Sequence, residues 1–387
     1  MKDFDYLREG EVYFDTACQS LRPRPVIEAL NEYYTQFNSC GERAKYQWGQ
    51  TTSEKVEEVR ASVLRHLGLR NRDYVVSFTL NTTYGINLLL SQFQTELFSK
   101  VMTSDIEHNS PFLSTITFAQ KHKIKREVIT RNEDGSIPVE NYDFKQALVV
   151  VNCASNVDGR KLQNIRELIK TVHKQKGIII IDAAQAMAHS ADLLNKTEAD
   201  AICFSAHKMY APSLGIMVVR RDLFVKIDTT FIGGGMVDDV RLDNYDLSSL
   251  SSNHAYAKFE AGLQAWGEII ALGKAIKWLE DRPKSDKENL KACTENLYGF
   301  LASQPKIQLI NHEPNPTMTF FVEGLDSHLL GEALSDEGIM ARTGYFCVHY
   351  YLDHIKHYPP LIRFSLGYHV RPSDVDKAIS ALTKTLK

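Results

Sequence analysis

The stretch that decides the fold is Ile178-Ile-Ile-Ile-Asp182-Ala-Ala-Gln185, followed along the chain by Phe204-Ser205-Ala206-His207-Lys208. Each stretch is typical of a short apolar strand that ends in polar residues. An acid at the end of a buried strand can keep a pyridine nitrogen protonated, and a lysine at the end of a later strand can form an imine with an aldehyde. The pair Asp182 and Lys208 therefore points to pyridoxal phosphate, a cofactor that acts as an electron sink.

Length and composition are those of a soluble globular protein. The chain has 387 residues, beyond the length at which one hydrophobic core stops growing, so one large and one smaller domain are expected. The formal net charge of −3 gives no reason to expect nucleic acid or an anionic membrane as a partner. No apolar run approaches the ~18 residues of a membrane helix. The amino terminus has no apolar stretch typical of a signal peptide, so a cytoplasmic location is expected.

The six cysteines are scattered without CxxC spacing. In a chain this long, that pattern argues against a disulfide framework and against a zinc site, so no metal is expected. Cys153 and Cys203 lie in apolar, strand-like runs, which predicts buried and inert thiols. Cys347 stands in a different context and is the candidate for chemistry.

Short apolar runs recur regularly from Ala147 onward. Strands are predicted at 148–151, 178–181, 201–204 and 216–219, with a helix face at 165–172. Because these runs are apolar throughout rather than alternating, both faces of the sheet should be covered. Strand, helix and strand in sequence predict an α/β fold with a mostly parallel sheet flanked by helices. Ligands bind such sheets beyond the carboxyl ends of the strands, which is where Asp182, Gln185, Ser205, His207 and Lys208 fall.

The remaining pattern predicts a second, smaller unit. A long amphipathic helix is expected at about 259–280, followed by a break at Asp281-Arg-Pro-Lys-Ser-Asp286. We therefore expect a large domain at 16–265 and a smaller α+β domain formed by 284–387 together with 1–15. An early helix is predicted from Ser53 to Leu67, with Ser53 as its N-cap.

A candidate phosphate site lies at Asn81-Thr82-Thr83, between the predicted strand 74–78 and a predicted helix with an apolar stripe. The stripe consists of Ile86, Leu89, Leu90, Phe93 and Leu97. Backbone N–H groups and two hydroxyls would meet there at the positive end of the helix. Asn and Thr are also ordinary N-caps, so this motif alone leaves both interpretations open. Ser205 and His207, next to Lys208, add further donors and favour a phosphate site.

Taken in order, these motifs resemble those of the class V aminotransferase-fold enzymes, and within them the cysteine desulfurase and selenocysteine lyase group. The resemblance covers nearly the whole chain and implies a pyridoxal phosphate enzyme of fold type I. It rests on Tyr13-Phe-Asp-Thr-Ala17, Asn81-Thr-Thr83, Glu107-His108, Ser155-Asn-Val-Asp-Gly159, Asp182-Ala-Ala-Gln185, His189, Ser205-Ala-His-Lys208, Gly233-Gly-Gly235, Phe259-Glu-Ala-Gly262 and Arg342-Thr-Gly-Tyr-Phe-Cys347.

The resemblance implies a role for each cofactor residue. Lys208 should bind the cofactor covalently, Asp182 should pair with the pyridinium nitrogen, and Gln185 should hydrogen-bond the ring hydroxyl. Asn156 should lie near that hydroxyl and the substrate carboxylate. His108 should stack on the ring and help to move protons. The phosphate should be held by Thr82, Thr83, Ser205 and His207.

The same resemblance implies the substrate residues. Arg363 matches the arginine that takes the substrate carboxylate, because its planar fork suits bidentate binding. Arg342 and Arg43 should also lie on the substrate side. In this family a cysteine at the position of Cys347 attacks the sulfur of the bound substrate cysteine, for which the thiolate is the reactive form. The short segment around Cys347 resembles the subgroup with a constrained cysteine loop, which depends on a dedicated acceptor protein.

The leading hypothesis is thus a cysteine desulfurase that converts L-cysteine to L-alanine and passes the sulfur of a Cys347 persulfide to an acceptor protein. L-Selenocysteine stays open as a substrate, and the family leads us to expect a homodimer. The alternatives are a selenocysteine lyase, C–S lyase or epimerase that does not use this persulfide, or a silent member that only binds partners. The chain departs from the family pattern at Leu263, where threonine is usual, and at Tyr345 and Phe346, where histidines are common.

Overall fold

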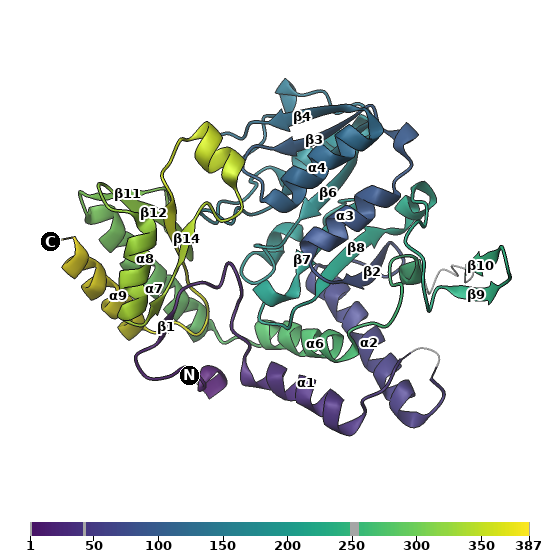
Figure 1. Ribbon diagram of the computed structural model, residues 1–387, viewed down its shortest axis with the longest axis horizontal. Coiled ribbons are helices and arrows are strands. Elements are labelled where there is room, and N and C mark those ends of the chain that lie inside the picture. The colour runs from purple at the N-terminus through teal and green to yellow at the C-terminus, as the bar shows by residue number, and fades with distance from the viewer. Residues whose placement is uncertain (1, 42–43, 248–254, 387) are drawn as a thin grey trace.

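The computed structural model describes residues 2–41, 44–247 and 255–386. Its central feature is a seven-stranded sheet with the order β2-β8-β7-β6-β5-β3-β4 (Figure 1). The strands are β2 (Tyr74–Thr79), β3 (Lys100–Ser104), β4 (Lys125–Ile129), β5 (Ala147–Asn152), β6 (Ile178–Asp182), β7 (Ala201–Ser205) and β8 (Gly215–Arg220). The pairs from β4 to β7 are parallel, whereas β8 runs antiparallel to both of its neighbours. The predicted mostly parallel sheet is confirmed.

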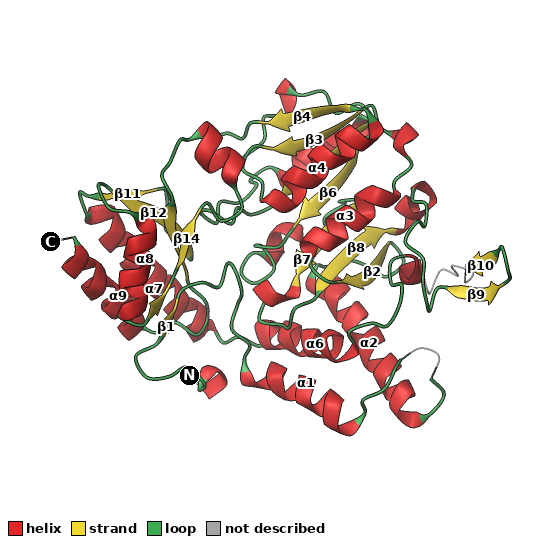
Figure 2. Cartoon of the chain, in the orientation of Figure 1, coloured by secondary structure: helices red, strands yellow, loops and turns green. Residues whose placement is uncertain are grey.

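Helices cover both faces of this sheet (Figure 2). Ile178 and Ile180 of β6 belong to a core with α3 (Thr82–Gln92) and α4 (Asn109–His122). Ile179 and Ile181 belong to the core on the opposite face, which also contains residues of the other helices of this region. These helices are α1 (Arg24–Gln36), α2 (Gln47–His66), α5 (Ile165–Lys174) and α6 (Trp266–Glu280). The absence of polar alternation in β5, β6 and β7 is explained, because each of these strands is buried on two sides, whereas the edge strand β4 is partly exposed.

A second, four-stranded antiparallel sheet has the order β11-β12-β15-β14. Its strands are β11 (Ile307–Leu309), β12 (Thr317–Val322), β14 (Arg342–Gly344) and β15 (Leu361–Ser365). The nearby helices are α7 (Lys284–Ser303), α8 (Ser327–Asp336) and α9 (Pro372–Thr385). Strand β1 (Val12–Tyr13) pairs with β13 (Ile339–Met340), and Phe14 packs into the core of this region. The domain boundaries themselves stay a prediction.

A hairpin of β9 (Val237–Val240) and β10 (Tyr245–Leu247) projects from the body of the molecule (Figure 1). No helix within the described ranges is both long and apolar enough to cross a bilayer.

Three predicted helix limits are wrong. Helix α2 begins at Gln47, so Ser53 is no N-cap; its Oγ donates to the Gly49 carbonyl inside the helix at 2.8 Å. Helix α3 ends at Gln92, before the last two residues of the predicted stripe. The helix expected at about 259–280 begins only at Trp266, because Gly262 has a φ of +82° that interrupts the helical backbone.

Candidate active site

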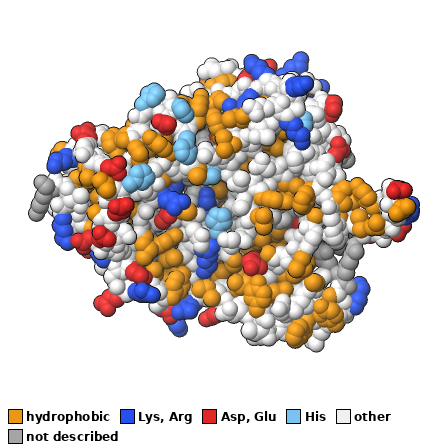
Figure 3. All heavy atoms as spheres, viewed as in Figure 1, with side chains coloured by type: hydrophobic (Ala, Val, Ile, Leu, Met, Phe, Trp, Pro, Cys, Tyr) orange, Lys and Arg blue, Asp and Glu red, His pale blue; other side chains and the backbone are white. Residues whose placement is uncertain are grey.

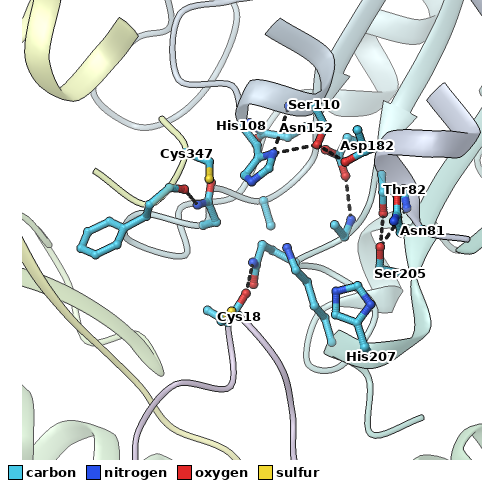
Figure 4. A pocket seen from close by; sticks show the side chains of 18 of the residues that line it. Cys18, Asn81, Thr82, His108, Ser110, Asn152, Asp182, Ser205, His207 and Cys347 are labelled. Atoms are coloured by element: carbon cyan, nitrogen blue, oxygen red, sulfur yellow. Dashed lines mark hydrogen bonds between the residues drawn. The ribbon is translucent and has the colours of Figure 1, made fainter. Parts of the chain in front are cut away.

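One cavity of about 280 Å³ lies where β6 and β7 end (Figure 4). It brings together every predicted site residue that the structure describes, whereas Arg43 lies outside the described residues. These residues are Thr82, Thr83, His108, Asn156, Asp182, Gln185, Ser205, His207, Lys208, Arg342, Cys347 and Arg363. The cavity therefore combines groups that are distant in sequence and come from both sheets.

Asp182 and Lys208 reach the cavity from neighbouring strands. Asp182 is the last residue of β6, and Lys208 ends the short 3-10 helix Ala206–Lys208 that follows β7. Burial raises the pKa of Asp182, although the nearby Lys208 opposes this shift. Burial likewise lowers the pKa of Lys208, which favours the uncharged amine that can react with an aldehyde. The backbone N–H of Ala184 donates to Asp182 Oδ1 at 2.9 Å and fixes the carboxylate.

A cluster of hydroxyls surrounds the amino end of α3. Asn81 caps this helix by accepting from the Tyr84 N–H at 2.9 Å. The Thr82 N–H donates to Ser205 Oγ at 2.9 Å, and the two hydroxyl oxygens lie 2.6 Å apart. At Gly215, a Cβ would lie 2.5 Å from the Asn81 nitrogen, so glycine lets β8 pass against this loop. Converging N–H groups and hydroxyls at a helix N-terminus fit a phosphate group.

His207 completes this end of the cavity as a neutral side chain. Burial, and then the charges of Lys208 and Arg22, lower the pKa of His207 to about 4. A neutral imidazole can donate one hydrogen bond to an anionic oxygen without adding a charge. His207 thus fits beside a phosphate, whose negative charge would meet the positive end of α3.

His108 caps α4 and points toward the cavity (Figure 4). Its Nδ1 accepts from the Ser110 N–H at 3.0 Å, so the proton of the neutral ring must lie on Nε2. Burial, followed by the charges of Lys208 and Arg363, lowers the pKa of His108 to about 3. The ring is therefore neutral at pH 7, and Nε2–H is free of the capping contact. Thr83 Oγ1 lies 2.6 Å from Ser110 Oγ and ties this turn to α3.

A buried ion pair supports the turn that carries His108. Arg131 Nη2 donates to Glu107 Oε1 at 2.9 Å and to the Asn152 carbonyl at 2.8 Å. Glu107 Oε2 accepts from the Asn152 N–H at 2.8 Å, so the network joins three strands. Burial raises the pKa of Glu107 to about 7 in spite of Arg131. Asn152 Oδ1 is buried without a partner among the described residues and lines the cavity, which fits a polar ligand.

Arg363 lies in the middle of β15, and its side chain is 3% exposed. Its Nη2 donates to Asp15 Oδ1 at 3.1 Å, and its Nη1 donates to the Asn156 carbonyl at 3.0 Å. Its Nε is buried and finds no acceptor in the described part of the chain. Arg342 sits directly opposite Arg363 in the antiparallel pair of β14 and β15, which places two cations together. The pair fits an anionic ligand such as a carboxylate.

Cys347 occupies a strained tight turn with its side chain exposed. The Val348 N–H donates to the Tyr345 carbonyl at 2.8 Å, and φ is +49° at Phe346 and +60° at Cys347. This is the geometry of a type I′ turn, in which glycine, asparagine or aspartate is usual. For ordinary side chains the left-handed region costs roughly 1–2 kcal/mol per residue, so outside contacts must hold the turn.

Two of these contacts are hydrogen bonds to backbone carbonyls of the turn, one from a backbone N–H and one from a side chain. The Asn109 N–H donates to the Cys347 carbonyl at 2.6 Å. Asn156 Nδ2 donates to the Phe346 carbonyl at 2.8 Å. Asn156 thus touches both Arg363 and the Cys347 turn, while Gln185 Nε2 donates to the Ala17 carbonyl at 2.8 Å on another wall.

Sequence reasoning missed several contributors to the site. The Asp15–Arg363 ion pair joins residues 348 positions apart, so no local pattern could indicate it. Cys18 also lines the cavity, directly after the motif that ends at Ala17, and its place beside that motif was the available signal. Ser110 could have been found as the second residue after a histidine N-cap.

Comparisons with known proteins agree with this arrangement. The family described as aminotransferase class-V matches residues 12–378. A probable cysteine desulfurase of Pyrococcus abyssi is 30% identical over 88% of this chain and 86% of its own length. A probable cysteine desulfurase of Chlamydia muridarum is 28% identical over 100% of this chain and 98% of its own length. The apo structure of a cysteine desulfurase from Thermococcus onnurineus superimposes with a TM-score of 0.88 at 26% identity, covering 100% of this chain and 98% of the other. The chain belongs to the class V aminotransferase family.

Proposed function

We propose that this protein is a pyridoxal phosphate-dependent cysteine desulfurase, which converts L-cysteine to L-alanine and keeps the sulfur as a persulfide on Cys347. The observation that carries the proposal is that Cys347 lines the same cavity as Lys208, Asp182 and Arg363. The proposal is also supported by relatives named probable cysteine desulfurase, whose similarity extends over 88% and 100% of this chain.

The residues present fit the cofactor. Lys208 would bind its aldehyde carbon, Asp182 its ring nitrogen, and Gln185 and Asn156 would lie near its ring hydroxyl. The hydroxyls and N–H groups at the start of α3, with Ser205 and His207, would hold its phosphate. When bound, pyridoxal phosphate supplies an electron sink that stabilises negative charge on the substrate carbons. A cationic ring nitrogen beside Asp182 would also offset the cost of burying that carboxylate.

Arg363 would orient the substrate through its carboxylate. Its buried Nε is available for a further acceptor, and Arg342 on the facing strand adds positive charge. A guanidinium favours carboxylates because two N–H groups can match two oxygens. His108, neutral with its proton on Nε2, would stack against the ring and pass a proton at the reacting atoms.

Cys347 would take the sulfur in its thiolate form. A bond forms between Cys347 Sγ and the substrate sulfur, and the carbon–sulfur bond of the substrate breaks. The electron pair of that bond stays with the carbon, and a proton completes L-alanine. Cys347 is left with a persulfide, and its exposed position at the turn suits delivery to another protein.

The test is incubation of the purified holoenzyme with L-cysteine, with L-alanine and protein-bound persulfide as readouts. The wild type should form both, and Cys347→Ser should form neither at a comparable rate while still binding the cofactor. A wild type that makes no alanine refutes the proposal. A Cys347→Ser variant with full turnover would instead favour a C–S lyase, and racemised substrate without alanine would favour an epimerase.

The nature of the substrate and acceptor can be tested in the same assay. We propose L-cysteine as the preferred substrate, so kcat/KM for L-selenocysteine should not exceed kcat/KM for L-cysteine under the same conditions. We also propose a dedicated sulfur-acceptor protein, because the short turn around Cys347 limits how far the persulfide can reach. A cytoplasmic location suits this chemistry, since a reducing compartment keeps thiols free; cell fractionation tests it.

We further propose a homodimer. Large apolar side chains stay exposed near the hairpin β9–β10, and Figure 3 shows hydrophobic side chains gathered on that side of the molecule. Val240 and Leu242 belong to the hairpin segment itself, with Leu242 97% exposed, and Phe231 and Leu263 are exposed large apolar side chains as well. Such a surface is typical of a subunit interface. Light scattering should give a dimer for the wild type and a smaller species for Leu242→Asp. Leu329→Asp, a similar change at an exposed leucine of α8, should stay dimeric; a monomeric wild type contradicts the proposal.

A further inference from the structure

Phe346 lies where the carboxylate site and the nucleophile turn meet. Its side chain is 8% exposed and packs in a small core with Ile106, Val348 and Leu361. The guanidinium carbon of Arg363 lies 4.9 Å from the centre of the Phe346 ring. A cation over an aromatic face is attracted to it, most strongly when both groups are removed from water. Arg363 is itself buried, so this contact is shielded from solvent.

The backbone of Phe346 is bound to the same arginine by a second route. Arg363 Nη1 donates to the Asn156 carbonyl at 3.0 Å, and Asn156 Nδ2 donates to the Phe346 carbonyl at 2.8 Å. Arg363, Asn156 and Phe346 therefore contact one another in a closed ring. A movement of the Arg363 guanidinium would therefore alter its contact with the Phe346 aromatic side chain and, through Asn156, the hydrogen bond to the Phe346 carbonyl.

The turn that follows needs such support. Phe346 and Cys347 both have positive φ, at +49° and +60°. Residues with ordinary side chains keep this conformation only where their surroundings hold it. On the far side, the Asn109 N–H donates to the Cys347 carbonyl at 2.6 Å. The turn that carries the Cys347 thiol is thus held by two hydrogen bonds to its carbonyls. The donor of one of them, Asn156, also contacts Arg363 in the candidate carboxylate site.

We propose that Phe346 is a positioning residue through which a carboxylate bound at Arg363 holds the Cys347 turn in its reactive geometry. A carboxylate on the guanidinium would restrain its position, and the Phe346 ring stacked against it would be restrained in turn. The thiol would then be placed most firmly when a substrate of the right charge is present. This inference rests on the proposed desulfurase function for the identity of the reaction. The coupling between carboxylate binding at Arg363 and the position of the Cys347 thiol does not depend on which reaction is catalysed.

The test measures how fast Cys347 of the holoenzyme is alkylated by iodoacetamide, read from the mass of its peptide. L-Alanine, which has the carboxylate but no sulfur, is compared with L-alaninamide, which lacks the carboxylate, each at a concentration that saturates the cofactor absorbance change. In the wild type, L-alanine should alter the alkylation rate several-fold more than L-alaninamide does. Equal effects of the two ligands would overturn the proposal without any variant.

Variants separate coupling from simple shielding of the thiol by the ligand. Phe346→Leu keeps an apolar side chain but removes the aromatic face, so the difference between the two ligands should vanish, and Phe346→Tyr should restore it. Phe321→Leu is the matched control, because Phe321 packs against the same small core. A ligand effect that persists unchanged in Phe346→Leu means shielding alone and overturns the proposal.

Steady-state kinetics give an independent readout. Misplacement of a reacting group by about 1 Å can cost roughly 100-fold in rate. Phe346→Leu should therefore lower kcat by about 10- to 100-fold with a much smaller change in KM, whereas Phe321→Leu should leave both near wild type. A change confined to KM contradicts the inference. The alkylation result still stands if no alanine is formed from L-cysteine, so failure of the proposed function and failure of the coupling can be told apart.

Discussion

Replacing Asp15 by asparagine tests whether Arg363 is a buried cation held ready for a carboxylate. Asp15 Oδ1 accepts from Arg363 Nη2 at 3.1 Å, and the two side chains are 16% and 3% exposed. Asparagine keeps an oxygen acceptor at this position, so the substitution removes charge rather than shape. Arg342, opposite Arg363 on the neighbouring strand, increases the positive charge that would be left uncompensated.

The expected loss is large for a single substitution. Breaking a buried ion pair by removing one charge costs about 3 kcal/mol, because the remaining charge stays buried without compensation. For a chain of 387 residues, the apparent melting temperature should then fall by roughly 4 °C. A saturating carboxylate ligand would supply the missing negative charge, so part of this loss should be recovered when L-alanine is present.

The assay is thermal unfolding of the holoenzyme with and without L-alanine. Asp5→Asn is the matched control, since Asp5 pairs with Arg24 at 2.5 Å but the side chains are 56% and 44% exposed. Exposed pairs contribute less than about 1 kcal/mol, so this control should melt close to wild type. The interpretation of Arg363 as a carboxylate site is refuted if Asp15→Asn melts at the same temperature as the control. It is also refuted if L-alanine does not reduce the difference in melting temperature between Asp15→Asn and the wild type.

Three further outcomes follow from the site. Ser205→Ala removes a hydroxyl proposed to hold the phosphate and should weaken pyridoxal phosphate binding by about tenfold in equilibrium dialysis, since a hydrogen bond to a charged group contributes about 1.5–3 kcal/mol. The folded-state pKa of His108 is lowered to about 3, so its stabilising contribution is present above its unfolded pKa of about 6.5 and is lost as the pH falls toward 3. Denaturation curves should therefore show a weaker loss of stability across that window in His108→Gln, and an unchanged pH dependence contradicts it. Gly215→Ala forces a Cβ to within 2.5 Å of the Asn81 nitrogen and should lower the free energy of unfolding by about 1–3 kcal/mol, measured by urea unfolding. The variant should also retain less cofactor, measured by absorbance.

Local patterns predicted the parts of the fold that depend on local physics. The run Ile178–Asp182 could be recognised because a strand buried on both faces has to be apolar throughout. The polar residues at its end followed from the rule that ligands bind beyond the carboxyl ends of parallel strands. Helix α2 was mispredicted because its N-cap, Tyr46, makes no side-chain capping hydrogen bond and so leaves no signal.

Other features depend on contacts that a linear pattern does not contain. The pairing of β1 with β13 joins opposite ends of the chain, and the ion pair of Asp15 with Arg363 does the same. The positive φ values of Phe346 and Cys347 contradict what their side chains prefer, and contacts with residues distant in sequence, such as Asn156 and Asn109, stabilise them. The resemblance indicated that Cys347 belongs to the site, but not how it is held there.

The most direct measurement is a single turnover of the holoenzyme with sulfur-labelled L-cysteine, followed by peptide mass spectrometry without reductant. Our account predicts one labelled sulfur on the peptide that contains Cys347, in the same molar amount as L-alanine, and none in Cys347→Ser. L-Alanine formed without labelled sulfur on Cys347 would contradict it.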